Sequence, residues 1–124
     1  MEFLIIFLSY FFGFIDAGES QRLLKVEPLG TFLIRFSSQA KMYSLSVATG
    51  NGSVAHWRIS VAEDGNTVNY DIDKRKFSSL NDLISKFSKE TLKSPQGNVS
   101  LKVPLERSKY KEIYVKEGYI VPEV

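Results

Sequence analysis

The segment from residue 30 to residue 38 constrains the fold most, because it sets an arginine inside an apolar strand. Its residues alternate with the period of a β-strand, with Phe32, Ile34 and Phe36 on one face and Leu33, Arg35 and Ser37 on the other. A guanidinium in such a strand is expected to be partly buried, where an unpaired charge is costly. No Asp or Glu occurs between Pro28 and Ala62. The strand therefore predicts that a ligand supplies the anion for Arg35. Two alternatives remain: a structural salt bridge to a carboxylate distant in the sequence, or an arginine that lies on the rim.

Two further strands favour the bound anion. Residues 43–48 alternate between apolar and small side chains, and residues 54–61 alternate with His56 and Arg58 on one face. The turn between them, residues 49–53, includes Asn51-Gly52, a strong hairpin signal. Three neighbouring antiparallel strands would bring together four side chains, those of Arg35, Ser37, His56 and Arg58. The cluster offers donors and no acid, which suits a dianionic phosphate.

Four motifs in order resemble the Src-homology-2 (SH2) domain family. They are GTFLIRFS at residues 30–37, YSLSV at 43–47, VAHWRI at 54–59 and FSSL at 77–80, preceded by FGFI at 12–15 and ESQRLL at 19–24. The resemblance covers roughly residues 10–105. It implies an α+β fold in which a central antiparallel sheet is flanked by two helices. It also implies a module that binds phosphotyrosine peptides and is not an enzyme.

The resemblance assigns a role to individual positions. The phosphotyrosine-binding set is Arg35 at the base of a pocket, Ser37, Ser38 and Lys41 in the phosphate-binding loop, and His56 and Arg58 flanking the ring. Trp57 matches a position that helps to select the residues after the phosphotyrosine. We expect these residues to lie in an apolar groove formed from Trp57 and the loops around 68–72, which contains Tyr70, and 94–98.

Two positions depart from the family pattern. Many members carry an arginine early in the first helix, where this chain has Ala17, and the usual tryptophan near the start is Tyr10. The loss of one cation implies that Arg58 contributes more to binding.

Local signals agree with two helices. Asp16 and Glu19 fit a capping box before a helix that continues to about Lys25, and Ser79 with Asp82 fits the same signature before a helix to about Ser88. In the second helix, one apolar face is formed by Leu80, Leu83, Ile84 and Phe87. Short strands are expected at residues 68–72 and 99–103, separated by polar loops.

The chain divides into three predicted parts: an apolar N-terminal extension at 1–9, the SH2-like domain at 10–105 and a tyrosine-containing tail at 106–124. The stretch 3–12 has the length of the apolar core of a signal peptide, but it lacks a positive flank and is too short to cross a bilayer. We expect it to pack against the core or a partner, so no membrane association is predicted.

The end of the tail, residues 117–124, is similar to the phosphorylated tail of the signal transducer and activator of transcription (STAT) family. In that family a tyrosine just after the domain is phosphorylated and binds the partner's domain reciprocally. The similarity implies a phosphosite at Tyr119 and a homodimer held through it. A flexible, unmodified end is the alternative.

Composition excludes several function classes. The chain has no cysteine, which removes disulfide frameworks and thiolate metal sites, and nothing predicts a metal or other cofactor. The net charge of +2 is too small to predict direct nucleic-acid binding. Ser37 and His56 could be interpreted as nucleophile and base, but no acid on the third strand would orient the imidazole.

We expect a cytoplasmic binding module for tyrosine-phosphorylated proteins in tyrosine-kinase signalling. The alternative is a STAT-like transcription-factor fragment that is also nuclear.

Overall fold

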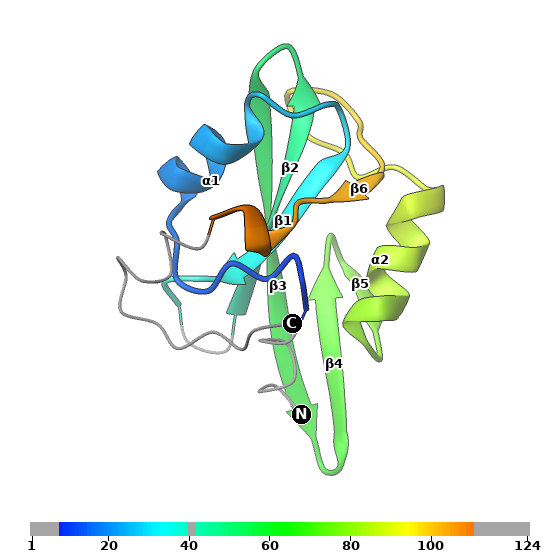
Figure 1. Cartoon of the computed structure of the whole chain (residues 1–124). Coiled ribbons are helices and arrows are strands. Elements are labelled where there is room, and N and C mark those ends of the chain that lie inside the picture. The colour runs from blue at the N-terminus through cyan, green and yellow to red at the C-terminus, as the bar shows by residue number, and fades with distance from the viewer. Residues whose placement is uncertain (1–7, 40–41, 111–124) are drawn as a thin grey trace.

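The computed structural model describes residues 8–39 and 42–110 of the chain (Figure 1). The elements follow in the order α1 (Ala17–Leu24), β1 (Thr31–Phe36), β2 (Met42–Gly50), β3 (Ser53–Asp64), β4 (Thr67–Ile72), β5 (Arg75–Phe77), α2 (Leu80–Lys89), β6 (Val103–Pro104) and the 3₁₀ helix η2 (Arg107–Tyr110).

The strands form one sheet in the order β5-β4-β3-β2-β1-β6, with α1 and α2 on its opposite sides (Figure 1). Neighbouring strands are antiparallel except for β1 and β6, which are parallel. The chain between these two strands contains β2 to β5 and α2. The predicted α+β class, a central antiparallel sheet flanked by two helices, is confirmed.

Strand β1 is buried on both faces because each helix covers one of them. Phe32 and Ile34 belong to a core cluster that contains Leu83 and Phe87 of α2. Leu33 points to the other side and belongs to a cluster with residues of α1. Since side chains alternate along a strand, Arg35 shares the α1 side with Leu33. The apolar setting of the arginine is thus a consequence of a strand enclosed between two helices.

Both helices begin at the predicted caps. The Asp16 carboxylate accepts a hydrogen bond from the Glu19 backbone N–H at 2.8 Å, and the Ser79 hydroxyl accepts one from the Asp82 N–H at 3.0 Å. The Glu19 carboxylate, expected to reach back to the cap, accepts two hydrogen bonds from Arg22, at 2.7 and 2.9 Å. One turn of helix brings these two side chains together, as is usual for residues three apart.

The β2–β3 hairpin turns at the predicted place, with positive φ at Asn51 (54°) and Gly52 (78°). Positive φ at both positions matches the right-handed twist of the flanking strands. The predicted strand at 99–103 is largely absent. Val99 forms only an isolated bridge with Leu92, and β6 pairs with β1 for two residues.

Packing continues past the predicted domain boundary at residue 105. Arg107 is 4% exposed, and its backbone N–H donates to the Ser9 carbonyl at 2.7 Å. Tyr110 lies against Phe12, with ring centroids 5.7 Å apart. In the part of the chain that the structure describes, no helix is long and apolar enough to cross a membrane.

Candidate anion-binding site

Arg35 is a buried arginine without an ion-pair partner among the described residues. It is 7% exposed, and the described salt bridges all lie elsewhere. Its Nε–H donates to the Ser46 hydroxyl at 3.4 Å, a long hydrogen bond. Burial lowers the pKa of Arg35, and the nearby Asp16 carboxylate partly offsets this effect. An arginine nevertheless keeps its proton near neutral pH, so the structure holds a buried cation whose charge is not neutralised.

Ser46 connects Arg35 to His56. This serine is 0% exposed, and its Oγ lies 2.7 Å from His56 Nδ1. Burial, and then the positive charge of Arg35, lower the pKa of His56, so the imidazole is neutral at pH 7. A neutral ring can accept at Nδ1, which lets the Ser46 hydroxyl donate to His56 while accepting from Arg35.

The sequence interpretation did not assign Ser46 to the site. The available signal was the alternation of Ser44 and Ser46 with apolar residues along β2. In the observed register, Ser44 lies opposite Arg35, and Ser46 lies opposite both Leu33 and His56. Directly opposed residues share a face, so both serines point toward the side that holds Arg35.

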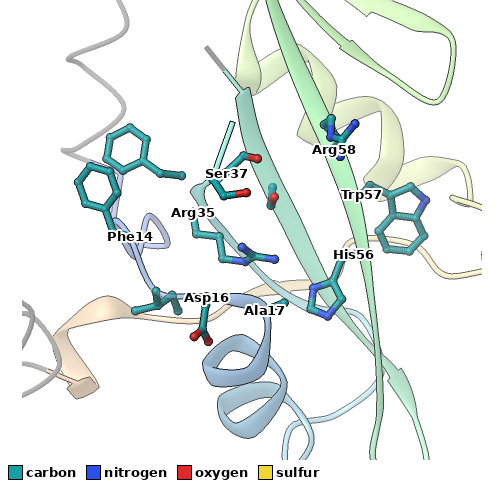
Figure 2. Close-up of a pocket in the computed structure, with 12 residues that line it drawn as sticks. Phe14, Asp16, Ala17, Arg35, Ser37, His56, Trp57 and Arg58 are labelled. Atoms are coloured by element: carbon teal, nitrogen blue, oxygen red, sulfur yellow. The ribbon is translucent and has the colours of Figure 1, made fainter. Parts of the chain in front are cut away.

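A cavity of about 580 Å³ opens above Arg35, and we call it the Arg35 cavity (Figure 2). Six predicted site residues line it: Arg35, Ser37, Ser38, His56, Trp57 and Arg58. The other walls include Phe14, Asp16, Ala17 and Ser44. Strands β1 and β3 therefore bring most of the predicted set together, as the sheet register requires.

Two predicted residues are not brought into this cavity by the described structure. Lys41 lies outside the described residues. Tyr70 is 8% exposed and packs within the core cluster on the α2 side, so it does not line the Arg35 cavity. It pairs with Val61 across β3 and β4, which places it beyond Trp57 along the strand.

A second cavity of about 280 Å³ adjoins the first, because His56 and Trp57 line both; we call it the Trp57 cavity. Its opposite wall is formed by residues 93–96, between α2 and β6, and Tyr70 does not line it either. The Trp57 indole N–H donates to the Lys93 carbonyl at 3.2 Å and so ties this loop to β3. Strand β4 pairs with β3 only from Ser60 onward, so at Trp57 no described strand lies beside β3 on the side away from β2.

The fold and this geometry agree with comparisons against known proteins. The model of the SH2 domain family matches residues 10–87. The chain belongs to the SH2 domain family, whose members are phosphotyrosine-binding signalling modules.

Individual relatives support this assignment. The chain is 33% identical over 78 residues to the dual specificity protein kinase shkA of Dictyostelium discoideum, covering 62% of this chain and 14% of the kinase. It is 35% identical over 98 residues to the SH2 domain-containing protein 2A of Mus musculus, covering 79% of this chain and 25% of that protein. The solution structure of the Monosiga brevicollis CRK/CRKL homolog SH2 domain has a TM-score of 0.68 and 33% identity, covering 81% of this chain and 88% of that one.

The chain spans between 14% and 25% of the length of the curated relatives that it matches. The family match ends at residue 87, and none of the comparisons supports the resemblance of the tail to the STAT family. Tyr119 lies outside the described residues, so its phosphorylation stays a prediction.

Proposed function

We propose that this chain binds tyrosine-phosphorylated proteins in intracellular signalling downstream of tyrosine kinases, with Arg35 as the anchor for the phosphate. The observation that carries this proposal is a 7% exposed guanidinium, without a carboxylate partner among the described residues, at the base of an open cavity. Phosphotyrosine carries roughly −1.5 to −2 charges near neutral pH and brings the missing anion.

The shape of the Arg35 cavity suits a phosphate on an aromatic ring. The guanidinium offers a planar fork of donors for two phosphate oxygens, and the Ser37 and Ser38 side chains add hydroxyl donors beside it. His56 and Arg58 line the cavity from β3, and we assign them to flank the ring, where Arg58 adds a second cation. A phosphorylated serine would carry the same charge but would bring no ring to these walls.

The residues after the phosphotyrosine are assigned to the Trp57 side. Trp57 lines both cavities, so one residue borders the phosphate and the neighbouring surface. Val54, Ala55 and Pro95 give the Trp57 cavity apolar walls, while its rim carries Lys93 and Gln96. We therefore propose that Trp57 and the loop 93–96, which overlaps the expected loop at 94–98, select these residues, and we leave out Tyr70, which is buried in the core and lines neither cavity.

The side chains of the site favour the binding of a ligand over its chemical conversion. Ser46, the hydroxyl that contacts His56, is fully buried and cannot reach a substrate. The Ser37 hydroxyl accepts a hydrogen bond from the Gln39 N–H at 3.2 Å and is not in contact with the imidazole through any described bond. A serine nucleophile needs a base within hydrogen-bond reach, so we assign the Ser37 hydroxyl to anion binding and not to catalysis.

Calorimetry with matched peptides tests the proposal. Arg35→Lys keeps the charge but loses the bidentate fork, and we expect a loss on the order of 2–5 kcal/mol in binding free energy. The unphosphorylated peptide is the ligand control, and a phosphoserine peptide tests the need for the ring. Equal affinity for phosphorylated and unphosphorylated peptides, or unchanged affinity in Arg35→Lys, would refute the anchor.

A further inference from the structure

The segment before α1 adds two groups of different chemistry to the Arg35 cavity. Phe14 and Asp16 lie on one side of the Arg35 guanidinium, and the β3 residues lie on the other (Figure 2). The Phe14 ring stacks on Phe36, with centroids 4.3 Å apart and planes at 30°, yet remains 59% exposed. An aromatic ring exposed on the wall of a binding cavity is a surface on which a ligand side chain can rest.

The carboxylate of Asp16 keeps capacity for a further partner. One oxygen accepts the Glu19 N–H at 2.8 Å, and no described residue makes an ion pair with Asp16. The adjacent residue is Ala17, whose methyl group neither neutralises the carboxylate nor fills this side of the cavity. The α1 side of the site is therefore acidic, whereas the β1 and β3 sides are basic.

A phosphate bound at Arg35 makes this acid unfavourable. It adds roughly two negative charges to a cavity that already contains the exposed carboxylate of Asp16, and these like charges repel, although solvent screens the repulsion. A cation on the ligand, placed beside Asp16, removes this penalty. Arginine and lysine are also the side chains that bind favourably over the face of an exposed aromatic ring, with their aliphatic stems along it.

We propose that Phe14 and Asp16 form a second subsite that selects an arginine or lysine shortly before the phosphotyrosine of the ligand. The proposal rests on the function proposed above, since it assumes that phosphotyrosine occupies the Arg35 cavity. The Trp57 cavity, on the other side of the site, indicates the direction of the peptide. Residues after the phosphotyrosine lie toward Trp57 and the loop 93–96, so residues before it pass Phe14 and Asp16. In an extended peptide, each residue advances about 3.3 Å, so the cation belongs within the two preceding positions.

The test compares alanine-rich peptides with a central phosphotyrosine that differ in one preceding residue, which is arginine, glutamine or glutamate. We measure Kd by fluorescence anisotropy with the full chain. The expected preference for arginine over glutamine is about three- to tenfold, the sum of an exposed ion pair and a cation–π contact. Glutamate should bind more weakly than glutamine, because it adds a third negative group.

Three variants test which residues of the domain cause the preference for arginine. Asp16→Asn removes the charge and keeps a side chain that caps a helix equally well, so α1 stays formed. It should reduce the arginine preference and tighten binding of the glutamate peptide. Phe14→Leu keeps an apolar side chain and should remove the cation–π part. Asp64→Asn, at the distant end of β3, is the control for net charge and should leave the preference unchanged.

The outcomes separate this proposal from the proposed function. Arg35-dependent binding of all three peptides with equal affinity overturns the subsite and leaves phosphotyrosine recognition intact. A preference that Asp16→Asn and Asp64→Asn reduce equally also overturns it, because a general charge effect is then sufficient. A fourth peptide carries the arginine after the phosphotyrosine, and tighter binding of this peptide than of the one with a preceding arginine contradicts the assigned direction. If no phosphotyrosine peptide binds at all, the proposed function itself fails.

Discussion

Replacing Ser46 by alanine tests whether the hydroxyl between Arg35 and His56 orients the anchor. Ser46 is fully buried, and its Oγ lies 3.4 Å from Arg35 Nε and 2.7 Å from His56 Nδ1. Ser46→Ala leaves the buried Nε–H without its described acceptor. The partly exposed imidazole can bond water instead, so only one of the two lost contacts is expensive.

The expected cost follows from these two contacts. Loss of one hydrogen bond to a buried donor is worth about 1 kcal/mol, which corresponds to about fivefold in Kd for a phosphotyrosine peptide. The free energy of unfolding should fall by a similar amount, seen as a decrease of about 3–6 °C in the melting temperature for a domain of this size. Calorimetry gives the first quantity and thermal unfolding the second.

Ser20→Ala is the matched control for this experiment. Ser20 is also fully buried, but its hydroxyl donates to the Asp16 backbone carbonyl at 2.9 Å and does not line the Arg35 cavity. It should lower stability without changing Kd. Unchanged affinity in Ser46→Ala, or an equal loss of affinity in Ser20→Ala, would refute the reasoning that Ser46 holds Arg35 in its binding geometry.

Three further outcomes are expected. His56 is the single histidine of the chain, and its pKa is lowered in the folded state. As the pH falls through about 6.5, the ordinary pKa of histidine, the imidazole is therefore protonated in the unfolded chain before it is protonated in the folded one. The melting temperature should therefore fall from pH 7.5 toward the lower pKa of the folded state, and His56→Asn should flatten this part of the profile; an unchanged slope contradicts the prediction. Trp57→Ala should change the ranking of peptides on a phosphopeptide array more than it changes the affinity for phosphotyrosine alone, whereas an unaltered ranking would assign Trp57 to packing. Phosphorylated Tyr119 should give an Arg35-dependent dimer in light scattering, and a monomer at tens of micromolar would rule out the reciprocal exchange.

The proposed phosphate-binding role of Arg35 could be predicted from the sequence, because the signals for it lie in the strand itself and in the residues that follow it. An arginine in an alternating apolar strand, with no acid over the next 26 residues up to Val61, needs a partner that the neighbouring strands do not supply. The hairpin at Asn51-Gly52 then fixes the register of β2 on β3, which together with the register of β1 on β2 places His56 and Arg58 on the side of Arg35.

The roles of Ser46 and Tyr70 depend on features that strand periodicity does not contain. Alternation assigns Ser46 to a face, and Ser46 lies directly opposite His56, but its contact with Arg35 is diagonal, because Arg35 lies opposite Ser44. Tyr70 lies on a strand that joins β3 only from Ser60, and α2 covers its face of the sheet. The last predicted strand fails for a similar reason. The Leu101 N–H donates to the Phe87 carbonyl of α2 at 2.8 Å, so the centre of the segment 99–103 packs against a helix, and strand pairing is limited to its two ends, Val99 and Val103.

The distribution of charge in the described site links its departure from the family pattern to its specificity. The two arginines that line the Arg35 cavity come from β1 and β3, while the α1 side contributes Asp16 and Ala17. The resemblance to the SH2 family implies an arginine on the helix side in many members, and such a cation would attract the phosphate and the ligand backbone of any sequence. Here the same side repels an anion, so a ligand gains from bringing its own cation there. In the proposed arrangement Ala17 therefore transfers part of the charge balance from the domain to the peptide, and we expect sequence selectivity before the phosphotyrosine to follow from that transfer.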